Sequence, residues 1–378
     1  MLVSVLVLGA MFWSLSSSET NSASKSGGSN DAQPVAVFCA ASNRAVMEAI
    51  KADYEKETGR RIEIQYGPSQ TLLSSIEVSG SGDLYLPADE SYLTMAQEKG
   101  LVLETLPLAN MQGVVAVRKG NPQSITTFDH LLKDGMRLVQ AGPDAAAIGK
   151  VTRRVLTEQG LWKKLEQGTT SFRGTVTEVA NDVVIDAADA GIVYDAVLHT
   201  YPDLEFVELP ELANTGSQIA VGVIAGSQQP QNALHFARYL AAEDRGLKRY
   251  AEFGFRPGEG DDWADVPELS VFAGSMLRPA IDETITAFEE REGVRVNRVY
   301  NGCGILVTQM QAGQHPDAYF ACDVEFMTQM RELFPDPVVV SQNELVILVQ
   351  KDNPLDITSL KDLSKENVRV GIGHEKKC

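Results

Sequence analysis

Two serines stand where a short apolar run gives way to a helical pattern. Ser42 follows the run "VAVFCAA", and Ser69 follows "RIEIQYGP". A serine hydroxyl donates a hydrogen bond, and the first N–H groups of a helix lack acceptors within the helix and lie at its positive end. Such turns can bind an anion. The alternative is that each serine is a plain helix N-cap.

The elements around these serines predict an α/β fold. Residues 35–42 have the pattern of a buried strand, residues 43–59 that of an amphipathic helix, and residues 61–67 that of a second strand. Strands that alternate with helices are typical of parallel sheets. Ligands of open α/β sheets collect at the carboxyl edge of such strands. We therefore expect Ser42 and Ser69 to lie together at that edge.

Composition limits the possible functions. A chain of 378 residues predicts two or more domains. The formal net charge of −18 argues against nucleic acid or an anionic membrane surface as a partner, because these need Lys/Arg clusters. The sequence contains no HExxH, no paired CxxC and no GxxxxGK motif. We therefore expect no cofactor, no metal and no enzymatic activity in the first part of the chain.

The N-terminal residues 1–34 form a separate segment. The run "MLVSVLVLGAMFWSL" has the length of a signal-peptide core, and a polar Ser/Asn/Gly tract follows it. It lacks the usual basic start, so an uncleaved anchor is an alternative, as is a buried helix. We expect a periplasmic or other extracytoplasmic location, with contact to the membrane only through this segment.

The chain repeats itself. A shift of 234 residues places Tyr66 on Tyr300 and Asp83 on Asp317. The period is that of a domain rather than of a stacked array. We therefore predict a tandem duplication, with a complete domain over residues 35–262 and a second copy, mostly its first lobe, over residues 268–378. Since that copy stops opposite the middle of the first, we expect a truncated chain.

The first copy resembles the periplasmic molybdate-binding proteins of ABC importers, which are type II periplasmic binding proteins. The resemblance covers nearly all of residues 35–257 and is carried by "AAS", "YGPSQTL", "GDLYLPAD", "AVRKGNP", "DAGIVYDA" and "YLAAEDRGLKRYAEFGFRP". It implies two lobes with the ligand held between them. It also implies that the chain crosses the hinge twice, near Gly113–Val117 and near Gln218–Val223.

The resemblance also implies ligand contacts from the second lobe. Ile148 and Val176 are expected as backbone donors and Tyr194 as a hydroxyl donor, with Tyr194 as a core aromatic whose hydroxyl meets water as the alternative. The family usually has a Gly-Ser-Gly turn where this chain has Pro68-Ser69-Gln70. Arg44 either touches the ligand or lies on the solvated helix face. Contact with Arg44 would alter the charge balance of the site and thus the preferred oxyanion.

The second copy carries different chemistry. Its candidate site residues are Ser275, Cys303 and Cys322, and Cys303 stands where the first copy has Ser69. A thiol donates more weakly than a hydroxyl. Together with His374 and Cys378, these cysteines suggest a soft metal ligand set. The alternatives are a Cys303–Cys322 disulfide, buried small residues, or a catalytic thiol.

The sequence thus predicts a binding protein that captures molybdate or tungstate outside the cytoplasmic membrane. Its lobes would close on the ligand and deliver it to an ABC permease and its ATPase. The alternatives are a binding protein for sulfate or phosphate, an enzyme that uses Cys303 as nucleophile, and a soft-ligand or metal-binding sensor module.

Overall fold

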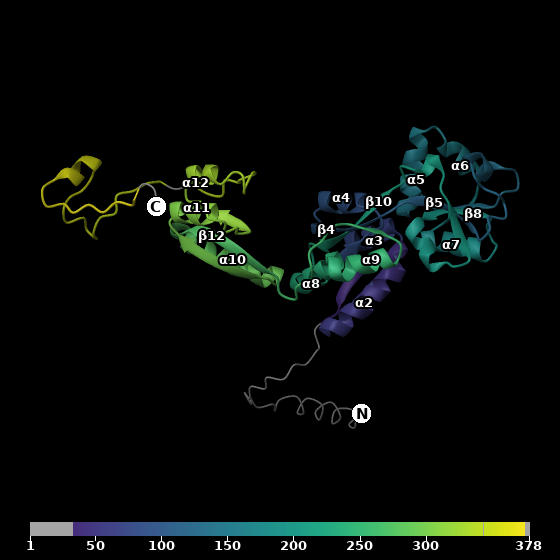
Figure 1. The fold of residues 1–378 in the computed structure, drawn as a ribbon, viewed down its shortest axis with the longest axis horizontal. Helices are drawn as coiled ribbons and strands as arrows, with labels where there is room; N and C mark the ends of the chain where they lie inside the picture. Colours follow the sequence, from purple (N-terminus) through teal and green to yellow (C-terminus); the bar gives the residue numbers. More distant parts are fainter. Residues whose placement is uncertain (1–32, 343, 375–378) are drawn as a thin grey trace, which may run out of the picture.

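A computed structural model describes residues 33–342 and 344–374, and Figure 1 shows their arrangement. The predicted signal or anchor segment falls almost wholly outside these residues, as does Cys378. Among the described helices, none combines the length and the apolar character that a membrane span needs.

The first lobe is built on a six-stranded sheet in the order β11-β4-β10-β3-β1-β2. Strand β1 pairs in parallel with β2 and β3, whereas β10 is antiparallel to β3 and β4. Its strands are β1 (Val35–Ala40), β2 (Ile62–Gly67), β3 (Leu84–Leu86), β4 (Val102–Met111), β10 (Ser217–Ile224) and β11 (Arg256–Pro257). Its helices are η1 (Ala41–Asn43), α2 (Arg44–Thr58), α3 (Ser69–Ser79), α4 (Ser91–Glu98), α8 (Pro230–Ala241), η5 (Glu243–Leu247) and α9 (Lys248–Glu252).

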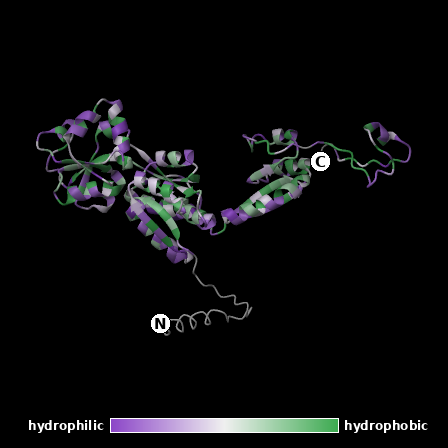
Figure 2. Ribbon diagram, turned by 180° about the vertical axis from the view of Figure 1, so that it is seen from behind, coloured by the Kyte–Doolittle hydropathy of each residue, from purple (hydrophilic) through white to green (hydrophobic). Residues whose placement is uncertain are grey.

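The second lobe has a five-stranded sheet in the order β7-β6-β8-β5-β9. Its strands are β5 (Gly113–Arg118), β6 (Leu138–Ala141), β7 (Thr169–Arg173), β8 (Ala190–Tyr194) and β9 (Leu204–Val207). Its helices are η2 (Phe128–Leu132), α5 (Ala147–Glu158), α6 (Trp162–Gly168), α7 (Val176–Val184), η3 (Asp195–Thr200) and η4 (Pro210–Leu212). Figure 2 shows that hydrophobic residues concentrate along the strands of both lobes. The predicted two-lobed α/β fold is confirmed.

The chain passes between the lobes twice. It leaves the first lobe at Gln112, between β4 and β5, and returns between η4 and β10. The two passages are joined, because Gln112 Nε2 donates to Leu212 O at 2.7 Å and to Thr215 Oγ1 at 3.1 Å. A Cβ on Gly113 would lie 2.3 Å from Thr215 Oγ1, so only glycine allows this close approach.

The predicted crossing positions were wrong by a few residues. Residues 113–117 lie within β5 of the second lobe, and residues 218–223 lie within β10 of the first lobe. The crossings fall just before each of these strands. The sequence signal marked the strands because their apolar runs are strong, whereas the connecting residues have no pattern of their own.

A second unit (residues 268–334) repeats part of the first lobe. It contains β12 (Glu268–Gly274), η6 (Ser275–Leu277), α10 (Arg278–Glu292), β13 (Arg295–Asn301), α11 (Cys303–Gln311), β14 (Ala318–Phe320) and α12 (Val324–Gln329). Its sheet order β13-β12-β14 matches β2-β1-β3, and both pairings keep their register when each residue number is raised by 234.

Side-chain contacts of the two units also correspond. Asp83 Oδ2 accepts from the Ala36 N–H at 2.8 Å, and Asp317 Oδ2 accepts from the Ser270 N–H at 2.7 Å. These aspartates and their partners are related by the same shift of 234 residues. The agreement therefore extends from strand register to individual hydrogen bonds.

Beyond the second unit, residues 335–374 contain no strand within the part that the structure describes, and only the short helix η7 (Leu360–Ser364). In the first lobe, β4 joins the sheet through β10, which comes from residues 217–224. A counterpart of β10 would lie beyond residue 378. The segment that corresponds to β4 therefore has no strand beside it, and apolar residues such as Leu345 and Leu348 are exposed.

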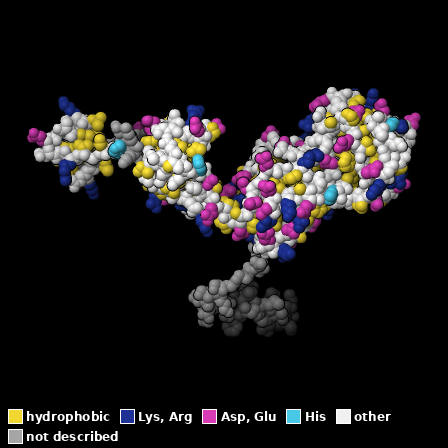
Figure 3. All heavy atoms as spheres, in the orientation of Figure 1, with side chains coloured by type: hydrophobic (Ala, Val, Ile, Leu, Met, Phe, Trp, Pro, Cys, Tyr) yellow, Lys and Arg dark blue, Asp and Glu magenta, His cyan; other side chains and the backbone are white. Residues whose placement is uncertain are grey.

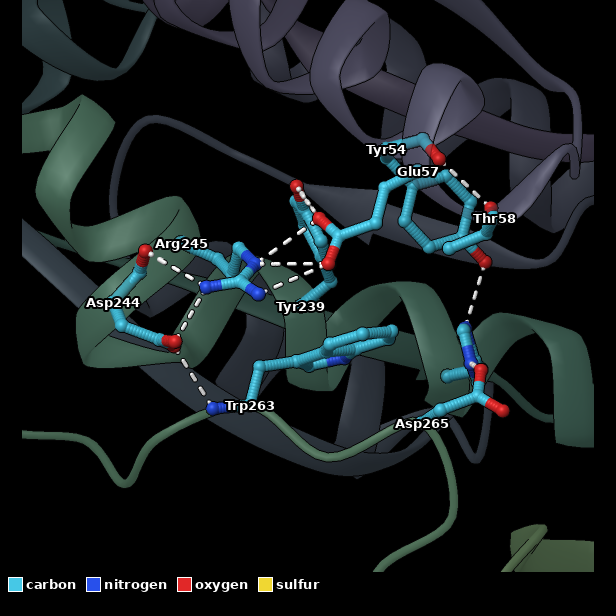
Figure 4. Close-up of polar contacts among 9 residues, drawn as sticks. Tyr54, Glu57, Thr58, Tyr239, Asp244, Arg245, Trp263 and Asp265 are labelled. Atoms are coloured by element: carbon cyan, nitrogen blue, oxygen red, sulfur yellow. Dashed lines mark hydrogen bonds and ion pairs between the residues drawn. The ribbon is translucent and has the colours of Figure 1, made fainter.

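The linker between the units (residues 258–267) is held against the first lobe (Figure 4). Asp265 Oδ1 lies 2.9 Å from His235 Nε2, and His235 Nδ1 lies 2.8 Å from the Tyr54 hydroxyl. The Trp263 ring meets the His235 ring edge-on at 5.4 Å. Contacts with the first lobe therefore continue to Asp265, past the predicted boundary at residue 262.

Candidate functional site

The five residues that the sequence predicts as ligand contacts line one pocket where the two lobes meet. They are Ser42, Ser69, Ile148, Val176 and Tyr194. The remaining lining consists of small or neutral residues: Ala40, Ala41, Gly67, Pro68, Ala88, Ala146, Ala147 and Thr175. The centre of a water-sized sphere can occupy about 20 Å³ here. The pocket therefore suits a compact ligand, because about 10–15 Å³ on this measure already holds one water molecule.

Four helix starts meet at this pocket. Lining residues belong to the first turns of η1 and α3 in the first lobe and of α5 and α7 in the second. The first N–H groups of each helix lack acceptors within the helix and carry a partial positive charge. Helix α7 is fixed by a capping box between Thr175 and Glu178. The pocket is thus surrounded by backbone donors from both lobes.

The start of α5 reaches the pocket because Gly149 lets the helix approach the end of β6. A Cβ on Gly149 would lie 2.4 Å from the Ala141 carbonyl oxygen. Near this point the lobes touch, since the Gln70 N–H donates to the Ala145 carbonyl at 3.2 Å. Lys150 Nζ also reaches across to Ser91 Oγ at 3.2 Å.

The two serines of the first lobe keep their hydroxyl protons for the pocket. Ser69 Oγ accepts from the Ala88 N–H at 3.1 Å, and Ser42 Oγ accepts from Asn43 Nδ2 at 3.3 Å. Neither side chain caps a helix, so the N-cap alternative was wrong for both. Each hydroxyl is therefore placed to donate into the pocket.

No charged side chain lines this pocket among the described residues. Arg44 is exposed, and its guanidinium lies 4.2 Å from the centre of the Tyr66 ring. Across the face seen in Figure 3, Lys and Arg side chains are scattered among Asp and Glu. A ligand in the pocket would therefore meet neutral hydrogen-bond donors and helix ends.

Tyr194 lies where the sequence predicts it, but its hydroxyl has partners that the sequence did not indicate. The hydroxyl lies 2.7 Å from Ser217 Oγ, and Ser217 Oγ donates to Asp89 Oδ2 at 2.9 Å. Tyr194 is only 1% exposed, so its hydroxyl does not meet bulk water. Ser217 has no sequence signal, whereas Asp89 recurs in the repeat as Asp323.

The corresponding position in the second unit holds a disulfide. Cys303 and Cys322 are bonded, and the Cys322 N–H donates to Cys303 Sγ at 3.2 Å, as the Ala88 N–H does to Ser69 Oγ. Ser275 is exposed. The described residues contain no cluster of three or more His, Cys, Asp or Glu side chains placed to hold a metal ion. The structure thus has the disulfide alternative, whose sulfurs are not thiolate ligands.

The fold and the pocket between two lobes define a periplasmic-binding-protein-like protein. The sequence profile of the family described as bacterial extracellular solute-binding protein matches residues 35–256 and 269–377. The chain belongs to this family.

Individual relatives agree with this assignment. The molybdate-binding protein ModA of Mycobacterium bovis is 25% identical over 228 residues, which cover 60% of this chain and 85% of that protein. ModA of Escherichia coli is 26% identical over 233 residues, covering 55% and 89%. These relatives are binding proteins rather than enzymes.

Solved structures show the same fold. The periplasmic molybdate-binding protein of Azotobacter vinelandii has a TM-score of 0.53 and 19% identity, with 60% of this chain and all of that chain covered. The periplasmic binding protein AfuA of Actinobacillus pleuropneumoniae, with fructose-6-phosphate bound, has a TM-score of 0.53 and 12% identity, covering 61% and 88%.

Proposed function

We propose that the chain is an extracytoplasmic binding protein that captures a tetrahedral oxyanion, molybdate or tungstate, for an ABC importer. One observation carries this proposal. Four helix starts from two lobes and two serine hydroxyls surround a small pocket whose lining contains no charged side chain among the described residues. Such a site offers many donors to an anion and no counter-charge that would favour a carboxylate or a cation.

The size of the pocket supports a compact anion over other solutes of this family. A space of about 20 Å³ for water-sized centres leaves no room for a sugar or a peptide. Molybdate, tungstate and sulfate share shape and charge, so the choice among them depends on small differences in size. The ModA relatives favour molybdate and tungstate over sulfate and phosphate.

The proposal includes partners and location. Capture outside the cytoplasmic membrane requires export, for which residues 1–34 would act as a signal or anchor, and delivery requires a permease with its ATPase. We further propose that the second unit arose by tandem duplication of the first. The shared strand register, the paired Asp83 and Asp317 contacts and the family match to both parts support this origin.

Calorimetry tests the proposed ligand. The chain should bind molybdate or tungstate more tightly than sulfate or phosphate. Ser42→Ala and Ser69→Ala should each weaken binding by roughly 10- to 150-fold, because loss of a charge-assisted donor costs about 1.5–3 kcal/mol. Ser74→Ala, an exposed serine on the same helix as Ser69, is the matched control and should bind as the parent does. Unchanged affinity in the Ser42→Ala, Ser69→Ala double variant would exclude this pocket as the binding site.

A further inference from the structure

Three buried oxygen atoms form a row beside the pocket. The Tyr194 hydroxyl lies 2.7 Å from Ser217 Oγ, which lies 2.9 Å from Asp89 Oδ2. The exposed fractions of Tyr194, Ser217 and Asp89 are 1%, 2% and 8%. Tyr194 belongs to the second lobe, and the other two belong to the first. The row therefore joins the lobes next to the proposed anion site.

Counting protons shows that this row is complete without a ligand. Each of its two contacts needs one proton between the oxygens. Tyr194 and Ser217 carry one hydroxyl proton each, and an ionised Asp89 carries none. Since Ser217 gives its proton to Asp89, the Tyr194 proton must lie between Tyr194 and Ser217. No proton of the row is left to point into the pocket.

An anion next to the Tyr194 hydroxyl would add a third contact. A fully ionised oxyanion has only acceptors, so it would face a lone pair of the Tyr194 oxygen and be repelled. Burial raises the pKa of Tyr194 above its usual range, so the phenol keeps its single proton at neutral pH. Three contacts then need three protons, and the protein supplies two.

We propose that the pocket binds its anion together with one proton, which Asp89 takes up from solvent. With Asp89 protonated, every hydrogen bond of the row reverses. Asp89 donates to Ser217, Ser217 donates to Tyr194, and Tyr194 donates to the anion. Asp89 is a positioning residue, because it sets the direction of the Tyr194 hydroxyl without touching the ligand. This inference rests on the proposed function and adds proton-linked regulation of the same site.

Other groups near Asp89 must be separated from this effect. The Ser91 N–H donates to Asp89 Oδ1 at 3.1 Å, so one carboxylate oxygen is held and only Oδ2 faces the row. The charged and titratable groups around Asp89 are Glu90 and Tyr92 on its own segment, Asp144, Lys150, Arg153 and Arg154 on or before α5, and Arg256 on β11. None of them lines the anion pocket.

Proton uptake can be measured directly. We would titrate the full chain with molybdate in buffers of equal pH and different ionisation enthalpy. The parent chain should take up about one proton per bound anion near neutral pH. The affinity should then rise about tenfold for each unit by which the pH falls, because one proton is linked to binding.

Two variants test the row itself. In Asp89→Asn, the amide N–H can donate to Ser217 as a protonated carboxyl would, so proton uptake should fall to near zero and the affinity should no longer depend on pH. In Ser217→Ala, the Tyr194 hydroxyl loses its acceptor and is free to donate to the anion, which should also abolish uptake. Glu90→Gln removes the same charge from the exposed neighbouring residue and should leave uptake near one proton.

The outcomes separate this inference from the proposed function. Molybdate binding without proton uptake in the parent chain overturns the inference and leaves the function standing. Uptake that persists in Asp89→Asn places the proton on the anion or elsewhere and also overturns it. If molybdate, tungstate, sulfate and phosphate all fail to bind, the proposed function falls, and this inference falls with it.

Discussion

The first lobe and the second unit share a frame but differ at one turn. In the first lobe, Ser69 opens α3 and its hydroxyl accepts from the Ala88 N–H. In the second unit, Cys303 opens α11, and it is bonded to Cys322 at the position of Ala88. Strand register and helix starts are the same, so the frame tolerates a complete change of chemistry at the site it positions.

A third difference makes room for the disulfide. Gly274 ends β12 where the first lobe has Ala40. A Cβ on Gly274 would lie 2.8 Å from Cys303 Sγ and 3.2 Å from Cys322 Sγ. Alanine would therefore collide with the sulfur atoms. The three differences form one set, in which a small donor site is replaced by a covalent link.

Transfer of this set into the first lobe should have the largest effect. The triple variant Ala40→Gly, Ser69→Cys, Ala88→Cys should form a disulfide in the pocket and weaken molybdate binding at least about 100-fold. Loss of one charge-assisted donor alone costs roughly 1.5–3 kcal/mol, and the second sulfur also fills space. Calorimetry on the oxidised protein measures the loss.

Two controls sharpen this test. Ala40→Gly alone should bind as the parent does, since it removes only a methyl group. Reduction of the triple variant by a dithiol should restore part of the affinity, because a thiol still donates weakly. Parent-like affinity in the oxidised triple variant would show that the Ser69 turn does not contact the anion.

Reversal of the change in the second unit should have the next largest effect. Cys303→Ser with Cys322→Ala restores the first-lobe residues and opens a link that spans 19 residues. In the chain-entropy description, a link of this length contributes roughly 3 kcal/mol. Hydrogen exchange of peptides from residues 268–334 should therefore accelerate, while peptides from the first lobe in the same sample should not change. Equal protection with and without the link would mean that the second unit is held by its small core alone.

Local patterns explain what could be predicted from the sequence. The turns at Ser42 and Ser69 follow strong strand signals, and the resemblance supplied Ile148, Val176 and Tyr194, which all line the same pocket. The internal repeat also indicated that Cys303 replaces Ser69.

Long-range contacts explain what could not be predicted. The partner of Tyr194 is Ser217, 23 residues away, and its partner Asp89 lies a further 128 residues back. No periodicity reports such a contact. The choice between a disulfide and free thiols was open for the same reason, because it depends on how closely Cys303 and Cys322 approach in space. The unpaired segment after the second unit was missed because its apolar pattern predicts a strand, whereas a strand also needs a neighbour.

The smallest expected effect concerns two tyrosines at matching positions. The Tyr85 hydroxyl donates to the Ser69 carbonyl at 2.8 Å, whereas the buried Tyr319 hydroxyl has no hydrogen-bond partner among the described residues. Burial raises the pKa of both side chains, that of Tyr319 to about 12, so both stay protonated at neutral pH. Removing one hydroxyl breaks a bond, and removing the other relieves an unpaired group.

Phenylalanine substitutions should therefore act differently in the two units. Tyr85→Phe leaves the Ser69 carbonyl without its donor and should destabilise the first lobe by about 1–2 kcal/mol. Tyr319→Phe removes a buried hydroxyl that gains nothing from the fold, so it should be neutral or slightly stabilising. Hydrogen exchange of each unit in the full chain measures both values under one condition. Equal destabilisation would mean that Tyr319 has a partner, such as a water molecule, and that the second unit keeps the polar support of this turn even though the turn has exchanged its serine for a disulfide.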